Sequence, residues 1–230
     1  MIKIVDLAAV IAIGFTSISL GQESPAPSPL STEMQPSPSP AIARSVRISF
    51  VPPPMEGTIS LGIFDSNKKL VRVLFREAKI DDFKIDETSL TTSWDGRSVR
   101  GEDLPPGKYH ARGFMVGDLK IEELASPATE PGQPGDHVAV KLVVNALLSD
   151  VRSVMDVGVG FDGTGSFLRT MDDLPLYSVS KTPNVARISI AKETEKTANV
   201  WQTDGTTTKQ FRVTNLDKMM AFDCGEIDLK

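Results

Sequence analysis

The alternation of apolar and polar residues predicts β-strands along most of this chain. Val46, Ile48 and Phe50 alternate with polar residues, which is the pattern of a strand with one buried face. Two further β-rich runs, 58–64 and 70–75, are separated by the turn-forming residues Asp-Ser-Asn-Lys. We therefore predict a strand followed by a β-hairpin at the start of the folded region.

The remainder of the region 45–120 continues this pattern without a helical period. A Trp-Asp-Gly corner lies at 94–96, and Leu-Pro-Pro-Gly at 104–107 predicts a turn into a closing strand, 108–116. Short strands separated by Gly, Pro and Asp turns are typical of a β-sandwich.

A second β-rich region follows a break rich in Pro and Gly at 125–136. Residues 138–144 alternate as a strand, although Leu147, Val151, Val154 and Met155 could also share one helical face, so both interpretations stay open there. The later runs favour strands: 157–161, 185–190, 198–202, 210–213, 219–222 and 227–229. We expect 185–190 to pair with 198–202 across a charged loop, and the chain to turn after 202 into 210–213. Asp-Gly turns in this half resemble those of β-propeller blades, and the region is expected to be a second sandwich-like unit or a partial propeller.

The first residues indicate export. Lys3 precedes an apolar run from Ile4 to Leu20, and small residues near Gly21 suit a signal peptidase, so we expect cleavage after Gly21 and a secreted or periplasmic location. A retained N-terminal anchor is the alternative, and is the one membrane contact expected. The Pro/Ser-rich stretch that follows favours an extended spacer, with a proline-recognising partner as its alternative reading.

Together these patterns predict an all-β protein with five segments. They are a signal peptide (1–21), a Pro/Ser-rich disordered linker (22–44), an immunoglobulin-like β-sandwich (45–122), a Pro/Gly linker (123–137) and a second β-rich domain (138–230).

The first β region resembles the immunoglobulin-like domain of the hook-capping (FlgD-type) family. The resemblance rests on a strand ending in Asp, a Trp-Asp-Gly corner and a Pro-Gly-x-Tyr entry to the last strand, and its motif residues are Asp65, Trp94, Asp95, Gly96, Gly101, Gly107 and Tyr109. It implies a structural role for these residues. We expect the indole to plug the sandwich edge, Asp95 to bond the turn backbone, Gly96 to take a positive φ, and the Tyr109 hydroxyl to reach a backbone group.

Composition argues against several functions. The formal net charge of −5 gives no electrostatic attraction for nucleic acid. The single Cys224 cannot form an intramolecular disulfide and is expected to be a buried filler. His110 and His137, the two histidines, have no Cys or His at ligand spacing, so we expect no metal site.

Two motifs fit turns better than ligand sites. The glycines between Gly158 and Gly163 match a dinucleotide fingerprint, but no β-α-β unit surrounds them. Asp162 and the pair Asp172-Asp173 lack the alternate-residue spacing of a calcium loop. We therefore expect no catalytic residue and no cofactor.

The leading hypothesis is a non-catalytic module that binds an unidentified protein or a cell-envelope component, with the acidic insert 79–89 as one candidate surface. The alternatives are an accessory β-domain or truncated relative of a secreted propeller protein or hydrolase, and a flagellar hook-scaffold component. A concave pocket with converging carboxylates would favour the hydrolase.

Overall fold

The structure, a computed structural model, describes residues 44–125, 127, 135–147 and 150–230. The predicted signal peptide, nearly all of the Pro/Ser-rich linker and much of the predicted 123–137 linker lie outside these residues. The described residues belong to one compact unit that begins at Ile42. Among them, no helix has the length and apolar character needed to cross a membrane.

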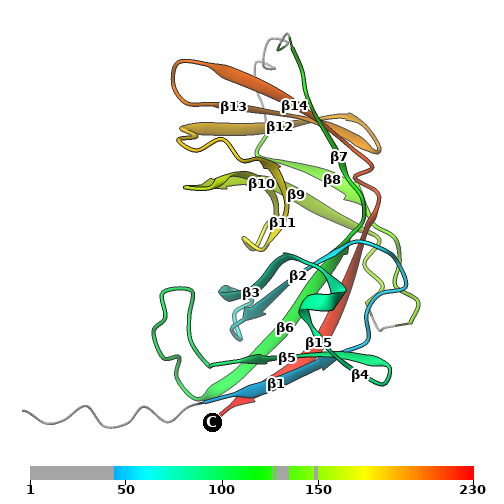
Figure 1. The fold of residues 1–230 in the computed structure, drawn as a ribbon, viewed down its shortest axis with the longest axis vertical. Coiled ribbons are helices and arrows are strands. Elements are labelled where there is room, and N and C mark those ends of the chain that lie inside the picture. The colour runs from blue at the N-terminus through cyan, green and yellow to red at the C-terminus, as the bar shows by residue number, and fades with distance from the viewer. Residues whose placement is uncertain (1–43, 126, 128–134, 148–149) are drawn as a thin grey trace, which may run out of the picture. The chain divides into compact units, whose positions relative to one another are not determined.

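The all-β prediction is confirmed (Figure 1). The described residues form four antiparallel sheets and one 3-10 turn, η1 (Ile80–Asp82). A three-stranded sheet has the order β1 (Val46–Phe50), β5 (Ser89–Trp94), β4 (Lys84–Asp86). A four-stranded sheet, here called the central sheet, has the order β15 (Met219–Leu229), β6 (Gly107–Val116), β2 (Thr58–Phe64), β3 (Leu70–Ala78).

Two more four-stranded sheets complete the fold. One has the order β11 (Pro175–Ser180), β10 (Gly165–Thr170), β9 (Val154–Asp162), β8 (His137–Lys141). The other has the order β12 (Arg187–Thr194), β13 (Thr197–Thr203), β14 (Thr208–Thr214), β7 (Lys120–Glu123). The two sheets bury their apolar residues in one core, and a bridge between Gly135 and Ile190 joins them. Val154, for which the sequence left strand and helix open, is the first residue of strand β9.

The central sheet is buried on both faces. Ile59, Leu61 and Ile63 of β2 pack in the cores shared with the three-stranded sheet. On the opposite face, the Ser60 hydroxyl donates to the carbonyl of Leu176 at 3.3 Å, and Phe64 joins the core of the β8–β14 sheets. Six consecutive residues of β2 are therefore buried, which departs from the alternation of a one-sided strand.

Strand pairing crosses the expected domain boundaries at 122 and 138. We call the three-stranded sheet and the central sheet the first module, and the two other four-stranded sheets the second unit. β15 pairs with β6 from Met219 to Leu229, so it completes the central sheet of the first module. β7 pairs with β14 and belongs to the second unit, which thus lies between β6 and β15 in the chain. The backbone N–H of Gly117 donates to the carbonyl of Lys218 at 2.8 Å, where the chain leaves the first module and returns to it. The alternation of residues marks a strand but does not specify a partner so distant in sequence.

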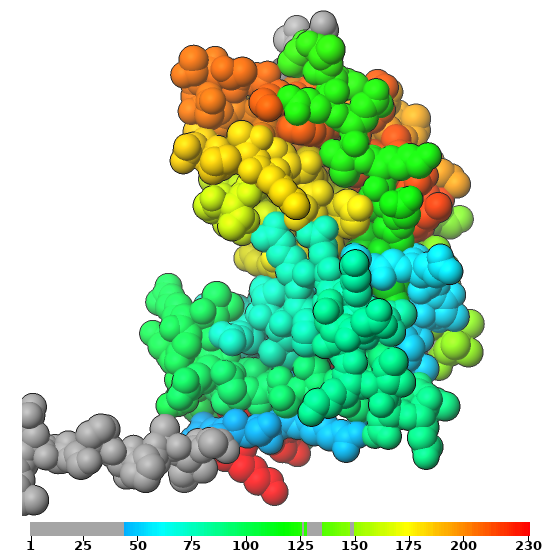
Figure 2. Space-filling model, viewed as in Figure 1, coloured from blue at the N-terminus to red at the C-terminus, as the bar shows by residue number. Residues whose placement is uncertain are grey.

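The predicted hairpins are present. β2 pairs with β3, and β12, β13 and β14 pair in succession. The insert 79–89 forms η1, β4 and the turn into β5. Figure 2 shows the surface of β3 meeting that of β11. Arg76 of β3 donates through Nη2 to the Ser178 hydroxyl of β11 at 3.5 Å, and its Nη1 lies 3.0 Å from Oδ2 of Asp162, the last residue of β9.

Candidate functional site

The sequence-predicted Trp and Tyr lie together inside the first module. Trp94 is 1% exposed, and its ring centroid lies 5.1 Å from that of Tyr109 in an edge-to-face arrangement. The indole N–H donates to the Arg97 carbonyl at 3.0 Å, and the Tyr109 hydroxyl donates to the Pro105 carbonyl at 2.9 Å. Both polar groups are thus satisfied by backbone carbonyls.

The other predicted motif residues lie in turns around this pair. Asp95 Oδ1 accepts the Arg97 backbone N–H at 3.0 Å. Gly96 and Gly101 have φ of 73° and 78°, a region that glycine adopts without strain. Asp65 Oδ1 accepts two backbone N–H groups of its own hairpin turn, and Gly107 opens β6. These positions shape the fold, and of the seven, only Asp65 and Tyr109 line the cavity described next.

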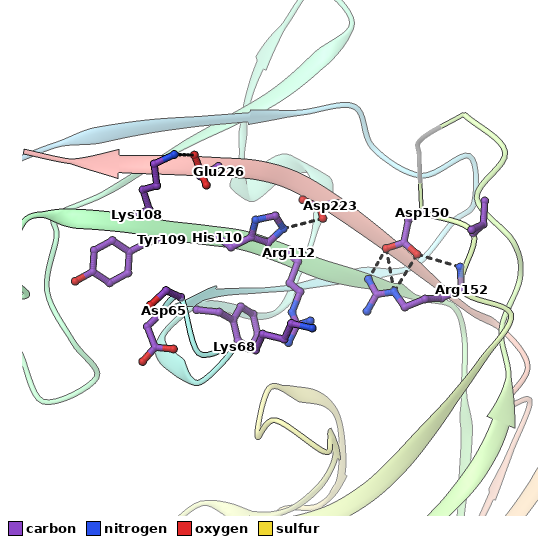
Figure 3. A pocket seen from close by; sticks show the side chains of 13 residues that line it. Asp65, Lys68, Lys108, Tyr109, His110, Arg112, Asp150, Arg152, Asp223 and Glu226 are labelled. Carbon is purple, nitrogen blue, oxygen red and sulfur yellow. Dashed lines mark hydrogen bonds and ion pairs between the residues drawn. The ribbon is translucent and has the colours of Figure 1, made fainter.

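A cavity of about 650 Å³ lies over the polar end of the central sheet (Figure 3). β6 and β15 form its floor. The hairpin turn that follows β2, with Asp65 and Lys68, forms one wall, and the segment 150–152 before β9 forms another. The same face of the sheet is apolar further along, at Phe114 and Ala221, where the second unit covers it. The cavity therefore begins where that cover ends.

Three basic side chains of β6 reach the cavity from alternate positions: Lys108, His110 and Arg112. Lys108 Nζ lies 2.6 Å from Glu226 Oε1, and His110 Nε2 lies 2.7 Å from Asp223 Oδ2. Residues 223 and 226 are an odd number apart and would face opposite sides of a regular strand. A register shift between Asp223 and Gly225, with Gly225 at φ 87°, brings both carboxylates to the cavity side.

The two arginines at the other end of the cavity are fixed by aromatic rings and carboxylates. The Arg112 guanidinium lies 4.0 Å from the centroid of the Phe64 ring and pairs with Asp172. The Arg152 guanidinium lies 5.1 Å from the centroid of Phe114 and donates through Nε to Asp150 at 2.9 and 3.0 Å. Stacking and pairing together hold both guanidinium groups in one orientation.

Electrostatics keep the Asp150 carboxyl ionised. Burial by itself would raise the pKa of Asp150, but hydrogen bonds from Arg152 and the positive charges of Arg152 and Arg112 outweigh it, so this pKa lies below its usual value. A carboxyl that delivers a proton in glycoside hydrolysis needs a raised pKa instead. Asp150 is suited to holding Arg152 in place.

The charges of the cavity wall are balanced. Its four permanent cations are Lys68, Lys108, Arg112 and Arg152, and its four carboxylates are Asp65, Asp150, Asp223 and Glu226. Among the described residues, no ion pair is found for Lys68. Charge-assisted hydrogen bonds are the strongest polar contacts available to a ligand here. The cavity can therefore bind a polar ligand that carries both donors and acceptors.

Sequence reasoning missed this cavity, although part of its signal was visible. The alternation Lys-x-His-x-Arg at 108–112 places three basic groups on one strand face. The matching carboxylates come from β15, whose pairing with β6 spans about a hundred residues and could not be read from local pattern.

Other reactive or charged residues have structural surroundings. Cys224 borders the cores of the first module, and burial raises the pKa of its thiol. Asp162 accepts hydrogen bonds from Thr164 and Arg76. The glycines from Gly158 to Gly163 lie along β9 and its hairpin turn into β10. No group of three or more metal-binding side chains occurs within the described parts of the chain.

Several aliphatic side chains are exposed on the described residues between β8 and β9 and at the first residue of β9. They are Val143, Val144, Leu147, Val151 and Val154, with Val151 the most exposed at 75%. Of these, Val151 lines the cavity. Singly exposed apolar residues are common on protein surfaces.

Comparisons of the chain with protein-family models, with curated proteins and with solved structures found no match. The site therefore has to be interpreted from its own geometry.

Proposed function

We propose that this chain is a non-catalytic, secreted or periplasmic bacterial protein that binds a protein or cell-envelope component, with the charged cavity as its contact site. The observation that carries the proposal is the cavity itself, in which Lys108 and His110 on β6 are held against Glu226 and Asp223 on β15. Sites built on strands hold their groups more accurately than sites built on loops. Binding, and not proton transfer, is the chemistry such fixed pairs favour.

The scaffold that we propose for this site is an immunoglobulin-like sandwich. Support comes from a three-stranded and a four-stranded antiparallel sheet that share their cores, which matches the strand number of a constant-type domain. The bond from Tyr109 to Pro105, a few residues upstream at the start of a strand, matches the tyrosine corner of such sandwiches. The second unit then occupies the connection between the last two sandwich strands.

Site-specific photo-crosslinking tests the proposed function. A photoreactive residue in place of Val151 lies at the cavity rim, and one in place of Val99, which is 63% exposed outside the cavity, is its matched control. We expect one defined crosslinked species from the exported full chain at position 151 and none at 99. The species should disappear with Lys108→Glu. Equal crosslinking at both positions, or a crosslink indifferent to Lys108→Glu, would contradict the proposal.

A truncated relative of a secreted hydrolase is the second candidate, because four carboxylates converge on the cavity. Its test is turnover of chromogenic glycoside and peptide substrates by the purified chain. Turnover that is lost in both Asp223→Asn and Glu226→Gln would replace the binding proposal with this one.

A further inference from the structure

The basic row on β6 has the repeat of an extended polypeptide. Lys108, His110 and Arg112 are alternate residues of one strand, so their side chains recur about every 7 Å along the cavity floor. Any extended peptide lying along β6 has the same repeat on the face it turns toward the sheet. Successive side chains of one peptide face can therefore meet successive basic side chains of the floor.

The carboxylates beside this row determine which charges the peptide must carry. Glu226 and Asp223 on β15 run parallel to the basic row and are hydrogen-bonded to Lys108 and His110, so the floor places carboxylates beside the Lys108 ammonium and the His110 imidazole. A ligand of one sign would be attracted by one row and repelled by the other. A ligand with both signs on one face satisfies both rows.

The cavity lacks the platform that a sugar ligand favours. Its aromatic side chains are Phe64 and Tyr109, which are 1% and 6% exposed. Phe64 is covered by the Arg112 guanidinium, and the ring of Tyr109 packs on Trp94. Neither ring offers a free face for stacking. The exposed rim residue is Val151, an aliphatic side chain that an apolar peptide residue can contact.

We propose that the cavity binds an extended peptide segment that presents acidic and basic side chains in alternation on one face. The inference rests on the proposed binding function and names its ligand class. The basic side chains of the segment pair with Glu226 and Asp223. Its acidic side chains pair with Lys108, Arg112 and the ammonium of Lys68, which forms no ion pair with the described part of the chain.

Four fluorescent, end-blocked octapeptides test this ligand class against the full chain by anisotropy. The first is Glu-Ser-Lys-Ser repeated twice, which places alternating charges on one extended face. Two controls replace Lys by Glu, or Glu by Lys, so that the face carries one sign. The fourth is Glu-Lys-Ser-Ser repeated twice, which places the two signs on opposite faces. We expect the first peptide to bind at least about tenfold more tightly than each of the other three.

Charge reversal then tests where the peptide binds. Lys108→Glu is expected to weaken binding of the alternating peptide about tenfold and to shift preference toward the all-Lys peptide, and Glu226→Lys should shift it toward the all-Glu peptide. Both side chains are more than half exposed, so the folded state is retained. Arg47→Glu, at the similarly exposed Arg47–Asp86 pair outside the cavity, is the matched control and should leave binding unchanged.

The ligand class is overturned if no peptide binds, if a single-sign or opposite-face peptide binds as tightly as the alternating one, or if neither cavity variant alters binding. Should the specific crosslink at position 151 persist in that case, the proposed function stands and only its ligand class fails. If both the selective binding of the alternating peptide and the specific crosslink at position 151 are absent, the proposed function and the proposed ligand class are both rejected.

Discussion

At the scale of single residues, the first module depends on a few buried polar contacts that the sequence already indicated. Trp94 and Tyr109 each combine a large buried ring with one hydrogen bond to a backbone carbonyl. Such groups stabilise a fold only while the bond is kept, since a buried donor without an acceptor is costly. Each of these hydrogen bonds joins residues three or four apart in sequence. The Trp-Asp-Gly and Pro-Gly-x-Tyr motifs could therefore indicate them.

Tyr109→Phe removes the hydroxyl that donates to Pro105 while keeping the ring. We expect the free energy of unfolding to fall by about 1 kcal/mol in urea titrations, because the Pro105 carbonyl loses its partner. Tyr177→Phe is the control, since its hydroxyl reaches the Leu119 carbonyl at a longer 3.4 Å. A larger loss for Tyr177→Phe than for Tyr109→Phe would contradict this account.

Asp150 links the cavity to acid stability. Its pKa is lower in the folded protein than in the unfolded chain, so it contributes stability above the unfolded value of 3.8, and that contribution is lost as pH falls through the folded value. Asp150→Asn should therefore lower the urea midpoint at pH 7, and the gap to the unmodified chain should shrink below pH 3.8. Asp86→Asn, at an exposed pair with Arg47, is expected to have a smaller effect. A gap that widens in acid would refute the argument.

At the scale of elements, the sequence predicted strands well and their partners poorly. Hairpins such as β2–β3 and β12–β13 join neighbours in the chain, so turn residues and alternation were enough to predict them. β15 was predicted as two short runs of a second domain, but it is one bulged strand of the central sheet. The local sequence of β15 does not identify β6 as its pairing partner, because that pairing depends on the packing of the whole molecule. The cavity could not be predicted for the same reason.

Removal of β15 tests its place in the first module. A chain that stops after Lys218 leaves one edge of β6 unpaired and uncovers Ile63, Tyr109 and their neighbours in the core. We expect it to lose near-ultraviolet circular dichroism from Trp94 and to aggregate. Adding residues 219–230 as a separate peptide should restore part of the signal. A shortened chain that still unfolds cooperatively with unchanged stability would show that β15 is dispensable.

At the scale of the whole molecule, burial of both faces of the central sheet couples the two β units. Phe64, Phe114 and Ala221 of the central sheet share one core with Val140 and Val200 of the second unit. An interface built from shared core residues favours one cooperative transition over two independent ones. This differs from two independently folded domains joined by a linker, which is the arrangement that the composition of 123–137 suggested.

The two tryptophans report on this coupling. Trp94 lies in the first module and Trp201 in β13 of the second unit. We expect Trp94→Phe and Trp201→Phe, each with one remaining tryptophan, to show coincident fluorescence and far-ultraviolet transitions in urea. Each substitution lowers the midpoint, so the comparison is made within one variant. Separate fluorescence and circular dichroism transitions would show that the units unfold independently.

The position of β15 also sets an order of events during biogenesis. Synthesis proceeds from the N-terminus, so β6 is synthesised before the second unit and β15 after it. The edge of β6 that pairs with β15 therefore stays unpaired until the second unit has been synthesised. An unpaired strand edge makes an unfinished β protein prone to aggregation. Because β15 also supplies Asp223 and Glu226, the same late strand that closes the sheet creates the carboxylate row of the cavity. A nascent or prematurely terminated molecule therefore lacks this carboxylate row, and under the function proposed above only chains completed through β15 would bind the ligand.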